Sequence, residues 1–266
     1  MADIRPRDAG PFGAHAVQLF GIPIQVSASW FLIVAMLTWS LAGGYFPARF
    51  PGLRPVLYGL LGAAAALLVF ACVLLHELGH SLIARRHGIP VGCIRLFFFG
   101  GQAQILRNAS RPSVELQMAA AGPLVSVGLV AGCVWGLAEI PPLTPVTAAL
   151  AALLRYLASV NMALLLFNLL PGFPLDGGRM LRAVLWAWLD SRWMRQRVGG
   201  RDEAFRRATR LASLLGILLG FGLMLLGGWV IVREGWLGGG WYLLLGWFLR
   251  RAAQASYRAA YVRIPN

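Results

Sequence analysis

The segment His76-Glu77-Leu78-Gly79-His80 lies inside an apolar run that begins near Val56. On a helix, residues four apart share one face, so the imidazoles of His76 and His80 can bind the same metal ion. Glu77 lies about 100° around such a helix and can address a water molecule on that metal instead of binding it. Two imidazoles and a carboxylate are costly in hydrocarbon and usually serve a function there. The segment therefore predicts a metal centre within a membrane span.

Composition places the chain among multi-pass membrane proteins. Of the 266 residues, 58% are hydrophobic and 13% are charged, and no polar stretch is long enough to fold as a separate soluble domain. The net charge of +14 would suit a nucleic-acid partner, but all 24 basic residues are arginines that fall mainly between apolar runs. That distribution is typical of membrane topology, so we expect no nucleic-acid partner. Cys72, Cys93 and Cys133 are scattered, which predicts neither disulfides nor a thiolate metal site.

The apolar runs predict an all-α polytopic membrane protein with about six transmembrane helices. The expected spans cover approximately residues 27–41, 56–84, 114–137, 147–170, 211–232 and 236–249. Pro47, Pro51 and Pro55 predict a loop between the first two spans. A basic segment, Arg192 to Arg210, links an amphipathic stretch, Asp176 to Leu189, to the fifth span. In this topology twenty arginines share one side with both termini and three lie on the other. We therefore expect a protein of the cell (inner) membrane with cytoplasmic termini.

Two stretches favour strands over long helices. Residues 14–26 alternate and contain Gly21-Ile22-Pro23, which suits a short strand or an interfacial segment. Residues 89–106 hold three phenylalanines before Gly100-Gly101, and we expect strands that turn at these glycines. Extended backbone at membrane depth must be buried in protein or line a cavity. This small membrane-associated β-segment should therefore lie beside the metal site.

Other local signals mark helix ends and helix packing. Arg85-Arg86-His87-Gly88 ends the second span, which favours a helix-end role for His87 over metal binding. Glu115 lies in the first turn of the third span, where the helix dipole favours a carboxylate. Gly216 and Gly220 form a GxxxG motif that either packs two helices closely or occurs by chance.

Asp176 is the candidate that completes the histidine pair. A catalytic zinc ion usually takes three protein ligands and leaves a fourth position for water. Asp176 follows a helix end broken by prolines, and irregular backbone there can present a carboxylate inside a protein-lined cavity. His80 precedes Arg85 by five residues and Asp176 precedes Arg179 by three, so both halves approach from the cytoplasmic side.

Two segments together resemble the site-2 protease family of intramembrane zinc metalloproteases: His76-Glu77-Leu78-Gly79-His80 and Asn168-Leu-Leu-Pro171-Gly-Phe-Pro174-Leu-Asp176-Gly177-Gly178-Arg179. Phe99-Gly100-Gly101 and Gly21-Ile22-Pro23 are also similar to that family, so the resemblance covers most of the chain. It implies a six-span core with one zinc ion held by His76, His80 and Asp176. It also implies Glu77 as the general base and a role for Asn168 near the reacting carbonyl.

The resemblance also bears on domain organisation. No PDZ-like domain is inserted between the motifs, so the chain resembles the compact subgroup, and we expect residues 1–266 to form a single membrane-embedded metalloprotease domain. Some members of that subgroup carry C-terminal CBS domains, which we expect to be absent or truncated in this chain.

The resulting hypothesis is a zinc metalloendopeptidase that cuts within or near the transmembrane segment of membrane-anchored substrates. The expected partners are the lipid bilayer and a single-span membrane protein, for which the resemblance suggests an anti-sigma or pro-sigma factor. Asn168 either donates a hydrogen bond to the oxyanion or serves as a turn residue before Pro171. The strand-like residues 97–103 can pair with an unwound substrate by edge addition.

Two other classes of function stay open. A membrane metal-ion transporter could use the same His/Glu/Asp cluster, although the sequence shows no internal repeat. An inactive scaffold that binds membrane partners is the third class, and an intact Glu77 disfavours it.

Overall fold

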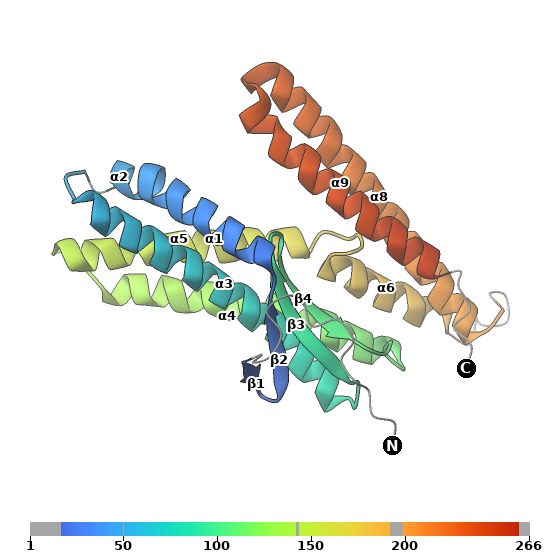
Figure 1. The fold of residues 1–266 in the computed structure, drawn as a ribbon. Helices are drawn as coiled ribbons and strands as arrows, with labels where there is room; N and C mark the ends of the chain where they lie inside the picture. Colours follow the sequence, from blue (N-terminus) through green and yellow to red (C-terminus); the bar gives the residue numbers. More distant parts are fainter. Residues whose placement is uncertain (1–16, 50, 142–143, 192–198, 261–266) are drawn as a thin grey trace. The chain divides into compact units, whose positions relative to one another are not determined.

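The computed structural model describes residues 17–49, 51–141, 144–191 and 199–260 (Figure 1). The chain forms two compact units. The first unit contains Met1–Arg107 and Leu124–Met162, and the second contains Asn108–Pro123 and Ala163–Asn266. The prediction that the whole chain acts as a single membrane-embedded domain stays a prediction.

The first unit is built on the long helix α3, Pro55–Arg86, which contains the expected second span. Ahead of it, α1 (Ala28–Ser40) continues through a single π-helical turn, Leu41–Tyr45, into α2 (Phe46–Arg49). The prediction that Pro47 belongs to a loop is therefore wrong. Pro47 is the second residue of α2 and follows the π-helical turn almost directly. Leu41 and Phe46 are buried in one apolar cluster, which favours continued helix over an exposed loop.

A four-stranded sheet belongs to the same unit and confirms both predicted strand regions. Its strands are β1 (Gln18–Leu19), β2 (Ile22–Val26), β3 (Val91–Phe97) and β4 (Gly100–Ile105), in that order across the sheet. β2 and β3 are parallel, whereas the other two pairs are antiparallel. The β3–β4 hairpin turns at Phe98 and Phe99, directly before the expected glycines, which instead begin β4. Residues 14–16 lie outside the described residues.

The turn between β1 and β2 explains the early glycine. Phe20 and Gly21 have φ values of 50° and 72°, as the two central residues of a type I′ hairpin turn require. The side chain of Arg85, near the end of α3, donates a hydrogen bond to the Phe20 carbonyl. The β1–β2 turn is thereby tied to the helix that carries the histidine pair.

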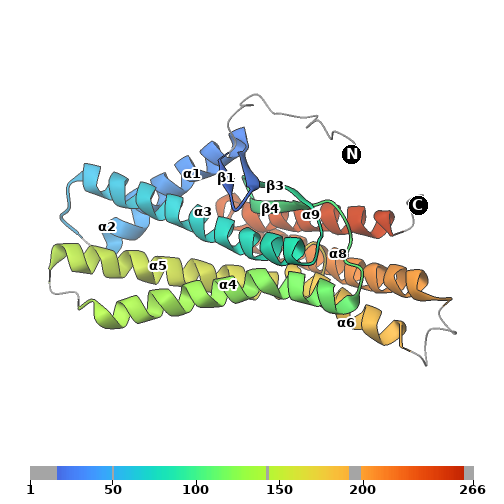
Figure 2. The same cartoon turned by 90° about the horizontal axis from the view of Figure 1, so that it is seen from below.

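The sheet packs against α3 through an apolar cluster. Ile22, Ile24 and Ile94 from β2 and β3 are buried with Leu78 of α3. Leu78 is one of the variable positions of the His76–His80 motif, so it anchors the sheet while its neighbours remain available for chemistry. Figures 1 and 2 show β3 and β4 beside the C-terminal half of α3.

Helix α3 ends where the basic residues and the glycine predict. His87 is the C-cap residue and Gly88 follows with φ of 70°. The Ile89 N–H donates to the Ala84 carbonyl and the Gly88 N–H donates to the Arg85 carbonyl, which is the Schellman arrangement. The structure thus places His87 at a helix end, as predicted.

Two helices run from one unit into the other along the chain. α4 spans Pro112–Glu139 and contains the expected third span, and α5 spans Pro145–Asn168 and contains the expected fourth span except its last two residues. Pro123, within α4, is the last residue of its segment in the second unit.

The second unit contains α6 (Asp176–Leu189), α8 (Arg201–Glu234) and α9 (Trp236–Ala259). α6 matches the predicted amphipathic segment. α8 begins ten residues before the expected fifth span, so the prediction that residues 201–210 form a linker is wrong. Asp202 and Glu203 lie in its first turn, where the helix dipole favours acids, and Ala204 and Ala208 are buried against Trp186 of α6. The remaining part of that linker, residues 192–198, lies outside the described residues.

Helices α8 and α9 lie side by side in both views (Figures 1 and 2). Glycines allow the close approach: a Cβ on Gly220 would lie 2.8 Å from the Gly246 carbonyl oxygen, and one on Gly227 would lie 2.8 Å from the Leu243 nitrogen.

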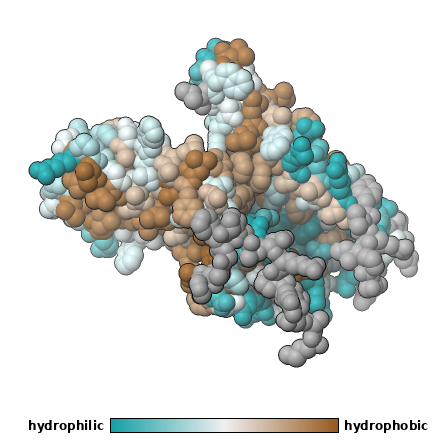
Figure 3. Space-filling view, in the orientation of Figure 1, coloured by the Kyte–Doolittle hydropathy of each residue, from teal (hydrophilic) through white to brown (hydrophobic). Residues whose placement is uncertain are grey.

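Within the described residues, five helices are long and apolar enough to cross a membrane: Ala28–Arg49, Pro55–Arg86, Pro112–Glu139, Pro145–Asn168 and Arg201–Glu234. The sixth expected span lies in α9, which is not among them. Large apolar side chains such as Trp135, Leu218 and Leu225 are exposed on these helices. Apolar surface is prominent on the face seen in Figure 3. Exposed apolar surface of this extent suits helices that face lipid.

Candidate metal centre

The two histidines occupy one buried face of α3, as their spacing predicts. Only 2% of His76 and 3% of His80 are exposed. Their Nε2 atoms lie 3.2 Å apart, and the two rings meet edge to face. Two imidazole nitrogens that converge in this way are the donor pair that a single metal ion requires.

Ser126 of α4 is hydrogen-bonded to the opposite nitrogen of His76. Its Oγ lies 2.9 Å from His76 Nδ1, and the serine is fully buried within the first unit. Metal-binding histidines generally use their second ring nitrogen in such a hydrogen bond, which sets the ring orientation and the tautomer. With Nδ1 engaged, Nε2 is the nitrogen left for a metal. No local signal in the sequence marks Ser126, a single serine on an apolar helix.

Glu77 turns away from the histidines and contacts β4. The Ala103 N–H donates a hydrogen bond of 3.0 Å to Glu77 Oε2. A Cβ on Gly101 would lie 2.8 Å from Glu77 Cγ, so the strand reaches this helix only because that position is glycine. The expectation that the glycine-rich segment lies beside the site is confirmed for the Glu77 side. The strand holds the carboxylate in a defined position.

Asp176, the first residue of α6, is 8% exposed in the second unit. Three glycines bring the preceding loop onto it. A Cβ on Gly177 would collide with the Leu169 carbonyl, one on Gly178 with the Gly172 backbone, and one on Gly216 of α8 with the Phe173 carbonyl. The Phe173 N–H also donates a 3.1 Å hydrogen bond to the Ala212 carbonyl of α8. Backbone packing therefore determines where Asp176 lies.

The two glycines of the GxxxG motif pack against different backbone segments. Gly216 packs against the backbone of Phe173, next to the aspartate, whereas Gly220 packs against Gly246 of α9. The sequence left open whether this motif packs helices or occurs by chance. The structure shows close packing at both glycines, and one of the two supports the site.

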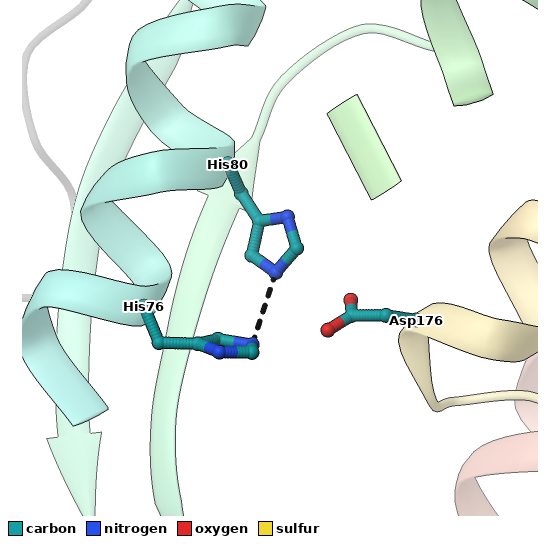
Figure 4. A group of neighbouring side chains, drawn as sticks. All are labelled: His76, His80 and Asp176. Carbon is teal, nitrogen blue, oxygen red and sulfur yellow. Dashed lines mark hydrogen bonds between the residues drawn. The ribbon is translucent and has the colours of Figure 1, made fainter. Parts of the chain in front are cut away.

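The three residues expected as ligands come together in the structure. One ligand atom from each of His76, His80 and Asp176 can be chosen so that all three lie within 4.8 Å of one another, and all three residues are buried. Figure 4 shows the Asp176 carboxylate pointing toward the two imidazoles. Two imidazoles and one carboxylate form a donor set that zinc uses in catalytic sites. The residues present therefore fit a zinc ion.

Asn168 is the last residue of α5 and is half-buried, eight residues before Asp176. Its position at a helix end is compatible with the turn role and with the catalytic role. Its assignment stays a prediction.

A second buried polar group links α4 to α6, and it was not predicted from the sequence. Glu115 of α4 is 1% exposed and binds two arginines of α6 within the second unit. The distance from Arg179 Nε to Glu115 Oε1 is 3.2 Å, and Arg182 donates to the same oxygen. Burial lowers the pKa of the Arg182 guanidinium, while the Glu115 carboxylate opposes that shift. An arginine nonetheless stays charged in such a setting.

Comparison with known proteins points to one family. The model of one protein family, Peptidase family M50, matches residues 64–145 and 136–200, which together cover more than half of the chain. This region includes all five expected site residues.

Two relatives extend the similarity over most of the chain. "Putative zinc metalloprotease sll0528" of Synechocystis sp. is 39% identical over 245 residues, which cover 92% of this chain and 60% of that protein. "Zinc metalloprotease MJ0392" of Methanocaldococcus jannaschii is 30% identical over 220 residues, which cover 79% of this chain and 55% of that protein. The chain thus spans less than two thirds of the length of these curated relatives.

A solved structure shows the same fold. The "Site-2 Protease from Methanocaldococcus jannaschii" superposes with a TM-score of 0.57 at 23% sequence identity, covering 94% of this chain and 96% of that one. The polytopic, mostly helical fold with a small sheet is thereby confirmed.

Proposed function

This chain belongs to Peptidase family M50, and from that premise we propose that it is an intramembrane zinc metalloprotease. It hydrolyses peptide bonds within or near the transmembrane segment of membrane-anchored substrates. The observation that carries the proposal is the buried His76, His80 and Asp176 group in a protein whose helices are long and apolar enough to cross a membrane. Buried ionisable groups are costly in such a protein and are retained where they serve a function.

One zinc ion would be held by His76, His80 and Asp176. When bound, zinc supplies the Lewis acidity that activates a water molecule at neutral pH. The second nitrogen of His76 is engaged by Ser126, which supports metal binding through Nε2. Three protein ligands leave one position open, as catalytic zinc sites require.

Glu77 is the general base of the proposed reaction. It follows His76 directly and, unlike the three ligands, contributes no atom to the group that could hold the metal. Its carboxylate accepts the Ala103 N–H, so one oxygen is oriented and the other can take a proton from water and return it to the leaving amine. Asn168 is the proposed donor to the oxyanion.

The substrate is an unwound single-span segment that adds to the edge of the sheet. β4 is the last strand in the order of the sheet, and it contacts Glu77 at Ala103. An extended chain paired to this edge would place its carbonyls next to the general base. Prolines introduced into β4 should reduce cleavage while zinc is retained. The resemblance to the site-2 protease family suggests membrane-anchored regulators such as anti-sigma or pro-sigma factors as the substrates.

The protein is an integral membrane protein, as its apolar helices and its family indicate. We place it in the cell (inner) membrane with both termini in the cytoplasm, because twenty arginines fall on that side of the expected topology. Residues 1–266 would act there as one metalloprotease domain.

The deciding experiment is Glu77→Gln in the purified, lipid-reconstituted protein. Zinc content should equal that of the wild type, whereas cleavage of co-reconstituted single-span membrane proteins should fall by about 10²–10⁴-fold. Ser159→Ala is the matched control, since Ser159 is exposed and hydrogen-bonds only its own helix among the described contacts. Persistent hydrolysis without Glu77 would refute the mechanism, and zinc transport across the vesicle without hydrolysis would indicate a transporter.

A further inference from the structure

We propose that Glu115 is a positioning residue for Asp176, acting through Arg179 and Arg182 of α6. The inference rests on the proposed function, in which Asp176 is a zinc ligand. Glu115 itself touches neither the ligands nor the substrate in this proposal. It fixes the helix whose first residue supplies the third ligand.

The charge cluster converges on a single atom. Arg179 and Arg182, one helical turn apart on α6, both donate to Glu115 Oε1. Arg179 is also one turn from Asp176, so the cluster holds the same first turns of α6 that present the ligand. Any rotation or sliding of α6 that moved Asp176 would break these two ion pairs.

Arg182 contacts two aromatic rings. Its guanidinium carbon lies 4.9 Å from the ring centroid of Phe173 and 4.9 Å from that of Phe205. Phe173 belongs to the loop that leads into Asp176, and Phe205 belongs to α8. The arginine therefore joins three elements of the second unit: the ligand loop, α6 and α8.

Stability alone does not account for such a cluster. Buried ion pairs contribute little net stability, because the cost of removing the charges from water offsets their attraction, and well-packed apolar residues often do as well. Charged groups instead impose one geometry, since any displacement leaves a buried charge without a partner. A zinc site depends on this, because its ligands must be held in place to within a fraction of an ångström.

The other end of α6 provides a matched control. Asp190 caps the C-terminus of this helix and pairs with Arg201 of α8, with 3.3 Å between Arg201 Nε and Asp190 Oδ2. This pair also joins α6 to α8, but it lies fourteen residues from Asp176 and half of Arg201 is exposed. It should support the helix without orienting the ligand.

The test measures zinc affinity of the full chain in lipid nanodiscs by competition with a chelator. Glu115→Gln should weaken zinc binding about 10–100-fold, as loss of groups that orient metal ligands generally does. It should also alter the visible absorption spectrum of the Co²⁺-substituted protein, which reports ligand geometry. Arg201→Ala should leave both the affinity and the spectrum unchanged. Arg179→Met keeps the Glu115–Arg182 pair and should weaken binding to a lesser extent, so it serves if Glu115→Gln does not fold.

A double-mutant cycle decides whether Glu115 acts through Asp176. In an Asp176→Asn background, replacing Glu115 should have little further effect on zinc affinity, because the ligand that it positions is already lost. Equal losses in both backgrounds, or an unchanged affinity and Co²⁺ spectrum in Glu115→Gln and Arg179→Met, would overturn the proposal. If Asp176→Asn itself binds zinc as tightly as the wild type, the proposed zinc site is wrong and the role of Glu115 falls with it.

Discussion

The two halves of the candidate metal centre are built by different physical means. In the first unit, His76, Glu77 and His80 are neighbours in the sequence, and the pitch of α3 places them. In the second unit, Asp176 is placed by backbone contacts of Gly178 and Gly216 and by a buried ion cluster. Two candidate ligands on the same helix are placed correctly as soon as that helix forms. A ligand at a helix start depends on everything that packs around it, which makes the aspartate side the more fragile half.

The largest effect should come from breaking the backbone contact beneath Asp176. In Gly216→Val, the new Cβ collides with the Phe173 carbonyl, and neither backbone can yield easily. We expect a loss of about 3 kcal/mol or more in unfolding free energy, read as a lower midpoint of thermal unfolding in detergent. Gly222→Val is the control, because a Cβ there meets nothing within 4 Å. Equal destabilisation by both would show that helix propensity, and not the contact with the loop, is responsible.

A matched disruption on the histidine side should affect catalysis more than stability. Gly101→Val would push the Glu77 side chain away from the edge of β4. Cleavage should fall about 100-fold, at the low end of what a general base contributes, while zinc content is retained. Gly92→Ala in β3 is the control, since its Cβ would contact only the flexible end of Gln104 and the tip of Leu106. Loss of zinc in Gly101→Val would argue that the strand also supports the ligands.

Removing the hydrogen-bond partner of His76 should have a smaller effect than either glycine substitution. Ser126→Ala removes the hydrogen bond between the Ser126 hydroxyl of α4 and His76 Nδ1. Zinc affinity, measured by chelator competition, should fall about tenfold. Comparing this loss with that of Glu115→Gln compares the histidine side of the site with the aspartate side. An unchanged affinity would mean that α3 alone is sufficient to orient the histidine.

The exposed ion pairs of the second unit should matter least. Glu203 binds Arg206 and Arg207 near the start of α8, and all three side chains are partly exposed. Glu203→Gln should cost less than about 1 kcal/mol of unfolding free energy, and added salt should reduce the difference. A loss of about 3 kcal/mol or more would contradict the expectation that exposed ion pairs contribute little to stability.

Sequence reasoning succeeded where chemistry follows local periodicity. The spacing of His76 and His80, the end of α3 shortly before Gly88 and the amphipathic stretch Asp176–Leu189 could all be predicted. In each case the decisive interactions lie within about one helical turn, so the pattern of residue types is sufficient. The pairing of the histidines with Asp176 needed the recognition of two motifs a hundred residues apart.

Long-range packing decided the rest. The helical continuation through Pro47 and the early start of α8 depend on burial against other elements, which outweighs local breaker and charge signals. Ser126 and Glu115 carry no local signature, because each becomes significant only through its partner on another helix. The sequence by itself predicted the ligand types and the class of chemistry. Only the tertiary structure decided which side chains orient them, because orientation depends on contacts between residues that the chain order does not bring together.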